Sequence, residues 1–159
     1  MKFITFIALF IFIQNTANAA DFVKAGHLVL SDAWGRASTS IKRPSTVYLK
    51  IENTSSIGDQ LISVHTPTAK RAELHNHFTE GGIVKMRQLK LIEIPPNKII
   101  LLKPSGFHIM LFELNTFLKT GEMFPINLTF KKAGEVSIKV QVADVGSVKS
   151  GKSSTKHAH

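Results

Sequence analysis

KIILLKPSGFHIMLFE, residues 98–113, contains two predicted β-strands and the turn between them. Lys98–Leu102 is an apolar run of strand length, and Phe107–Glu113 is the second strand. Pro104-Ser105-Gly106 separates the two runs, and proline and glycine favour tight turns over regular structure. The stretch therefore predicts a sheet of short strands joined by tight turns.

The rest of the domain repeats this pattern. Residues 46–53 alternate apolar and polar side chains, which is the period of a half-buried strand. Gly81-Gly82 lies between two further runs and predicts a β-hairpin. Short strands at intervals of about 8–12 residues predict an all-β fold, an antiparallel sandwich or a barrel. The other expected elements are strands at Asp59–His65, Ala72–Phe78, Ile83–Leu89, Ile126–Lys131 and Glu135–Ala143, and a short helical turn at Asn115–Lys119.

The two ends of the chain differ in composition from this domain. Residues 1–19 combine a basic start, an apolar run and Ala17-Asn18-Ala19, which is the pattern of a cleaved signal peptide; an uncleaved anchor is the alternative. Residues 146–159 lack apolar content and are predicted to form a disordered tail. We therefore expect secretion, a single domain over residues 20–145, and no integral membrane segment in the mature protein.

Composition excludes several functional classes. The chain has no cysteine, which excludes thiol–disulfide chemistry and disfavours a blue-copper electron carrier, because that site uses a cysteine ligand. The carboxylates are scattered and no Gly-x-Ser-x-Gly motif occurs, so we do not expect an enzyme. The net charge is +9, but the lysines are dispersed and Trp34 and Tyr48 are the only residues of their types. We therefore expect no nucleic-acid partner, and interpret the charge as favouring solubility and an acidic partner or membrane surface.

Two histidines and two methionines form a candidate metal site. His108 and Met110 are two residues apart on a predicted strand, so they share a face and lie roughly 6.6 Å apart along the chain. His75 lies on an earlier strand, and the predicted hairpin folds Met86 back beside it. Neutral imidazole and thioether donors favour Cu(I) over Zn²⁺, Mg²⁺ or Ca²⁺. The residue types alone leave a second interpretation open, in which the methionines only fill gaps in the core and the histidines are partly exposed polar residues.

The spacing of these residues resembles a known signature. His75, ten residues, Met86, twenty-one residues, then His108-x-Met110 is similar to the signature of the periplasmic copper chaperones of the PCu(A)C type. The segments 32–37, 47–53, 59–75 and 103–111 resemble other conserved parts of these proteins. The likeness covers roughly residues 27–144, essentially the whole mature domain.

The resemblance implies a cupredoxin-like antiparallel β-sandwich with Greek-key connections. It implies a periplasmic protein that holds Cu(I) near its surface through His75, Met86, His108 and Met110. It also implies delivery of copper to the CuA centre of cytochrome c oxidase, often alongside a second copper chaperone. The alternatives are a periplasmic protein for copper storage or detoxification, and a metal-free adhesion or assembly module on the same sandwich.

Several residues have a second interpretation. His77 stands where many PCu(A)C proteins have a methionine, and Val84 replaces a methionine that often precedes Met86. His77 is either an extra imidazole that assists Cu(II) or a solvated strand residue, and the second interpretation is favoured. Trp34 is expected in the sandwich core, with structural or surface roles for His27 and His65. Finally, the tail residues His157 and His159 either collect Cu(II) or have no role.

Overall fold

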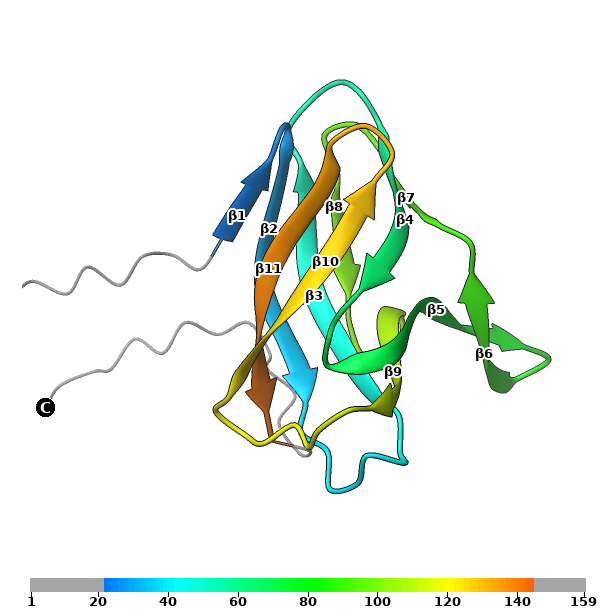
Figure 1. Cartoon of the computed structure of the whole chain (residues 1–159). Coiled ribbons are helices and arrows are strands. Elements are labelled where there is room, and N and C mark those ends of the chain that lie inside the picture. Colours follow the sequence, from blue (N-terminus) through cyan, green and yellow to red (C-terminus); the bar gives the residue numbers. More distant parts are fainter. Residues whose placement is uncertain (1–21, 145–159) are drawn as a thin grey trace, which may run out of the picture.

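The computed structural model describes residues 22–144, and all regular secondary structure in that range is β-strand (Figure 1). No helix long and apolar enough to cross a bilayer occurs within residues 22–144. The strands are β1 (Phe22–Ala25), β2 (Leu28–Arg36), β3 (Ser45–Asn53), β4 (Asp59–His65), β5 (Ala69–Glu80), β6 (Ile83–Leu89), β7 (Ile92–Ile94), β8 (Ile99–Leu102), β9 (Phe107–Leu114), β10 (Met123–Phe130) and β11 (Gly134–Ala143).

Every strand expected from the sequence is present, and three more, β1, β2 and β7, were not predicted. The helical turn expected at Asn115–Lys119 is wrong. The backbone N–H groups there donate to distant segments, from Asn115 to the Thr68 carbonyl at 2.8 Å and from Leu118 to Ser38 Oγ at 3.0 Å. Tertiary hydrogen bonds thus replace local helical ones. The predicted signal peptide and the whole of the predicted tail lie outside the described residues.

The strands form one continuous hydrogen-bonded sheet that folds over itself. Its order is β6-β5-β9-β8-β3-β2-β11-β10-β4-β7, with β1 added beside β2 and a further pairing of β9 with β3. Most neighbours are antiparallel, but β11 runs parallel to β2, and β8 runs parallel to β9 where Leu102 meets Phe107. Figure 1 shows β10 crossing over β3, while the β5–β6 hairpin projects from the body at the right.

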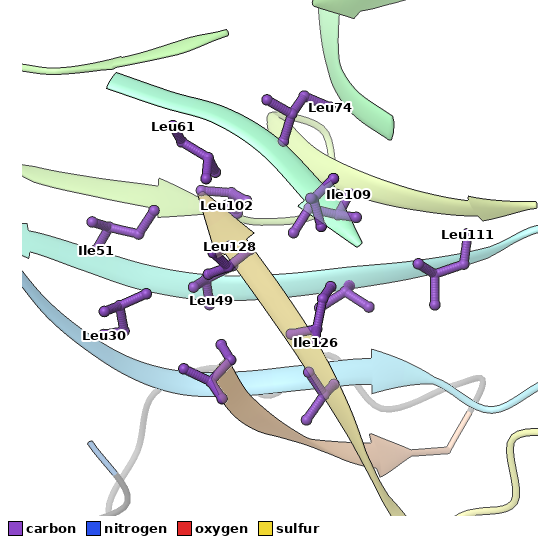
Figure 2. Close-up of a cluster of buried hydrophobic side chains, with 14 of the residues drawn as sticks. Leu30, Leu49, Ile51, Leu61, Leu74, Leu102, Ile109, Leu111, Ile126 and Leu128 are labelled. Atoms are coloured by element: carbon purple, nitrogen blue, oxygen red, sulfur yellow. The ribbon is translucent and has the colours of Figure 1, made fainter. Parts of the chain in front are cut away.

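The main core lies between the crossing layers. In Figure 2, Leu128 of β10 lies over Leu49 of β3, Ile126 lies farther along β10, and all three belong to one buried cluster. On β9, Ile109 and Leu111 belong to the same cluster. Because side chains alternate along a strand, the intervening residues of β9 point to the opposite, outer face of their layer. That outer face carries the candidate site.

A β-bulge in β2 changes which side chains enter the core. The pairing of β2 with β3 advances three residues from Ser31 to Trp34, while the partner strand advances only two. Asp32 adopts φ 54° at this point, and the extra residue reverses the alternation that had placed Leu30 in the core. Trp34 is therefore buried, as expected, but it packs in a separate small cluster with Tyr48 and not in the main core between the layers, where the sequence had placed it.

The same reversal turns Gly35 toward the core. A methyl group at Gly35 would lie 3.3 Å from the side chains of Phe124 and Val140. Phe124 and Val140 are buried, so they have little room to retreat. We expect Gly35→Ala to lower the free energy of unfolding by about 1–3 kcal/mol, the usual effect of overpacking. Urea unfolding measures the change. Gly58→Ala is the control, because the nearest atoms to an added methyl group there are at 3.5 Å. Equal urea midpoints for the two variants would contradict the close contact at Gly35.

Candidate metal site

Two histidines face each other across neighbouring strands. His75 of β5 pairs directly with His108 of β9, and the ring centroids are 5.9 Å apart. Two residues along β9, Met110 lies opposite Glu73 of β5 on the same face. The pairing of β5 with β9 thus brings together three of the four candidate donors.

The projecting hairpin places the fourth donor. Met86 of β6 lies directly opposite His77 of β5 and diagonal to His75, so it occupies the same face of the sheet. A shift of one residue in this register would turn Met86 to the other face. The sequence left that register open. The structure therefore brings all four predicted residues to one face, and the strand pairing adds His77 to them.

Hydrogen bonds fix which ring nitrogens are free. The Nδ1–H of His108 donates to the Gly106 carbonyl at 2.8 Å, which leaves Nε2 buried without a hydrogen-bond partner. The Nε2–H of His75 donates to Glu73 Oε2 at 2.9 Å, which leaves Nδ1 buried without one. Buried polar atoms are rarely left unpaired. A metal-binding histidine usually donates one ring N–H to a carbonyl or carboxylate oxygen and keeps the lone pair of its other nitrogen free for the metal.

His108 lies in the most buried part of the site. It is 1% exposed, and burial lowers its pKa below the ordinary value. The hydrogen bond to Gly106 opposes that shift, while the nearby His77 and His75 add to it. The ring is therefore neutral at neutral pH, as a metal ligand must be.

An aromatic wall borders the site on the β3 side. Tyr48 lies 6.4 Å from the His108 ring and 4.5 Å from Trp34, measured between centroids. The β2 bulge is what places Trp34 on this face. The rings of Trp34 and Tyr48 are both buried, so they form an apolar side of the histidine cluster.

The donor set limits the metals that the face can hold. Within residues 22–144, no three His, Asp or Glu side chains form a group with metal-site geometry. Sulfur from Met86 and Met110 would therefore have to complete any site that contains His75 and His108. Thioethers are soft donors that suit Cu(I) and contribute little to hard cations.

The structure corrects one interpretation and adds residues. His77 is not a solvated strand residue, because its Nδ1 is buried and its ring stacks on His108 at 4.7 Å. Sequence reasoning also missed Glu73 and the Gly106 carbonyl, which orient the two ligand rings. The i, i+2 spacing of Glu73 and His75 was the available signal.

His27 and His65 lie outside the site. His27 Nε2 is 3.6 Å from Asp59 Oδ2, so its structural role is confirmed, and His65 is exposed on β4.

Solved structures define the class of fold. The structure is similar to the copper-bound PCuAC domain of PmoF2, with a TM-score of 0.67 and 23% identity over 77% of this chain and 97% of that one. It is also similar to the apo PCuAC domain of PmoF1, with a TM-score of 0.67 and 24% identity, covering 77% of this chain and 98% of that one. The Cu(I) form of DR1885 from Deinococcus radiodurans matches with a TM-score of 0.59 and 27% identity over 70% of this chain and 74% of that one. The fold is therefore the cupredoxin-like sandwich of PCuAC domains, and the expected fold class is confirmed.

The sequence comparisons then place the chain in a family. Residues 28–142 match the model of the putative lipoprotein LpqE-like family, and the chain belongs to that family. A curated relative, the uncharacterized protein RP573 of Rickettsia prowazekii (strain Madrid E), is 25% identical over 115 residues, which make up 70% of this chain. The match spans 64% of the length of that relative.

Proposed function

We propose that this protein is a periplasmic copper chaperone that carries Cu(I) as its cargo on His75, Met86, His108 and Met110. One observation carries the proposal: two facing imidazoles each have one nitrogen hydrogen-bonded and the other buried without a partner. The register places both thioethers on the same face. The copper-bound domain of PmoF2 and the Cu(I) form of DR1885 support the assignment.

The proposed cargo fits the charge of the site. Two imidazoles and two thioethers are neutral, so a monovalent ion leaves a single positive charge on a partly exposed face. A divalent ion held by the same neutral donors would carry a higher charge, so its removal from water would cost more free energy. We propose no catalysis, since the site's residues serve to bind and release a metal ion.

Delivery to the CuA centre of cytochrome c oxidase, alone or with a second copper chaperone, is part of this proposal. It is supported by the resemblance of the spaced motif to PCu(A)C proteins. Exchange with an acceptor separates delivery from storage, because a storage protein releases copper slowly. A metal-free adhesion or assembly module would instead tolerate loss of the histidines.

The direct test is a competition titration of the mature protein, beginning at Ala20, against a chromogenic Cu(I) chelator. His157 and His159 are replaced by alanine so that only the folded domain is measured. One tightly held equivalent is expected, and Met86→Ala should weaken it at least about tenfold because a thioether is lost. Ile83→Ala, on the same exposed edge strand, is the matched control. A protein that holds no Cu(I) in this assay would contradict the proposal.

Glu73→Ala should lower the Cu(I) affinity about 10–100-fold although Glu73 is not a ligand. Its carboxylate accepts the Nε2–H of His75 at 2.9 Å and fixes the tautomer that leaves Nδ1 free. Loss of such an outer partner typically weakens metal binding by this factor. The same titration measures the affinity, with Glu52→Ala on β3 as the control, since the Glu52 carboxylate forms an ion pair with Lys50 at 3.4 Å. Equal affinities of the two variants would contradict the orienting role.

A further inference from the structure

His77 presents a donor atom that the four-residue site does not use. Its Nδ1 is buried and has no hydrogen-bond partner, although the side chain is only half-buried. The ring stacks on His108 with centroids 4.7 Å apart and planes 23° apart. Across the hairpin, His77 lies directly opposite Met86. An unpaired buried nitrogen beside an imidazole and a thioether is placed to bind a soft metal ion.

His108 lies close to two other histidines, both on β5. The ring of His75, directly opposite, is 5.9 Å away and the ring of His77, two residues further along β5, is 4.7 Å away, measured between centroids. Two imidazoles bound to one ion through bonds of about 2.0–2.1 Å have centroids a few ångström apart, in the range of both separations. Yet the three rings do not form a three-histidine centre within residues 22–144. The geometry is that of two overlapping histidine pairs, His75–His108 and His77–His108. The first pair has Met110 beside it and the second has Met86.

The two pairs differ in their access to solvent. His75 and Met110 are 7% and 9% exposed, whereas Met86 is 46% exposed. Met86 lies on β6, whose only pairing within residues 22–144 is with β5, at the edge of the sheet. Val84, two residues earlier on the same face, is also exposed. An incoming acceptor therefore reaches the His77–Met86 side first.

We propose that His77 and Met86 form an exchange position through which Cu(I) enters and leaves the buried His75–Met110 side. This inference rests on the proposed function. In the exchange, a bond from copper to His77 Nδ1 forms as the bond to His75 Nδ1 breaks, while His108 stays bound. Copper remains Cu(I), no electron or proton is transferred, and the acceptor supplies the donor that finally displaces His77. The acceptor class is a protein site with imidazole, thioether or thiolate donors.

The test compares transfer rate with affinity in the mature protein. Cu(I) transfer to an excess of chromogenic chelator is followed by stopped flow in wild type, His77→Phe and His77→Met. Phenylalanine keeps a ring against His108 but removes the nitrogen, whereas methionine restores a soft donor. His65→Phe, an exposed histidine on β4, is the matched control.

We expect His77→Phe to slow transfer about tenfold while the equilibrium affinity changes less than about threefold, and His77→Met to restore most of the rate. An unchanged transfer rate in His77→Phe would overturn the exchange position. A loss of affinity as large as that of His108→Phe would also overturn it, because His77 would then be a ligand of the resting site.

A spectroscopic readout is independent of transfer. Ag(I), a Cu(I) mimic, is titrated into ¹⁵N-labelled protein and the imidazole nitrogens are followed by long-range ¹H–¹⁵N correlation. We expect Ag(I) to shift His75 Nδ1 and His108 Nε2, the nitrogens of the resting site, and to broaden His77 Nδ1, which the ion visits in exchange. A His77 Nδ1 resonance that neither shifts nor broadens would overturn the inference. If wild type binds neither Ag(I) nor Cu(I), the proposed function itself fails; if it binds both and His77→Phe behaves as wild type, only the exchange position fails.

Discussion

His108→Ala should lower the Cu(I) affinity of the mature protein by at least about 100-fold, more than loss of an outer-sphere residue does. His108 is the central donor, because its Nε2 is free while its Nδ1–H is held by the Gly106 carbonyl. Both His75 and His77 lie against its ring. The competition titration with a Cu(I) chelator measures the loss.

A buried residue requires a check on folding. His108 is 1% exposed, so alanine leaves a cavity, and His108→Phe fills it without restoring a donor. Both variants should lose copper while keeping a cooperative urea transition. His65→Ala, which changes an exposed residue of β4, should bind as wild type does. Retention of wild-type affinity by a folded His108→Phe protein would refute the ligand assignment.

Asp59→Asn should lower the free energy of unfolding by about 3 kcal/mol at pH 7, or roughly 10 °C in Tm for a domain of this size. Its side chain is fully buried. Oδ1 accepts the backbone N–H groups of Gln60 at 2.8 Å and Lys132 at 2.9 Å, and Oδ2 accepts that of Ala133 at 3.0 Å. An amide NH₂ in place of one oxygen faces these donors and leaves one unsatisfied.

The loss of stability in Asp59→Asn should depend on pH. Burial by itself would raise the pKa of Asp59, but the backbone N–H groups of Lys132, Gln60 and Ala133, together with His27, lower it below 3.8 overall. A lowered folded-state pKa contributes stability that is present above about pH 4 and is lost as pH falls through the folded value. The difference between wild type and Asp59→Asn should therefore shrink in that acidic window.

Urea unfolding at pH 7 and in steps below pH 4 measures both effects. Asp32→Asn is the matched control, because Asp32 is exposed and asparagine tolerates its φ of 54°. The free energy of unfolding of Asp32→Asn should stay within about 0.5 kcal/mol of the wild-type value. If Asp59→Asn unfolds at the same urea concentration as Asp32→Asn, the carboxylate does not stabilise the fold as its contacts indicate.

Strand positions were predictable because they depend on local information. The alternation in residues 46–53 and the Pro104-Ser105-Gly106 turn act over a few neighbours, and β3, β8 and β9 appear where expected. β2 was missed because its bulge at Asp32 breaks the period-two pattern. The segment 115–119 was wrongly assigned because its hydrogen bonds go to residues far away in the chain.

The sequence by itself determined the all-β class, the strand that carries His108 and Met110, and a set of soft neutral donors without cysteine. Only the tertiary structure decided that His75 lies opposite His108, that Met86 shares their face, and that His77 stacks beside them. The reason is physical: residue type and i, i+2 spacing fix a side chain's chemistry and face within one strand. Register between strands, and the hydrogen bonds that free one nitrogen of each ring, depend on long-range pairing that no local pattern specifies.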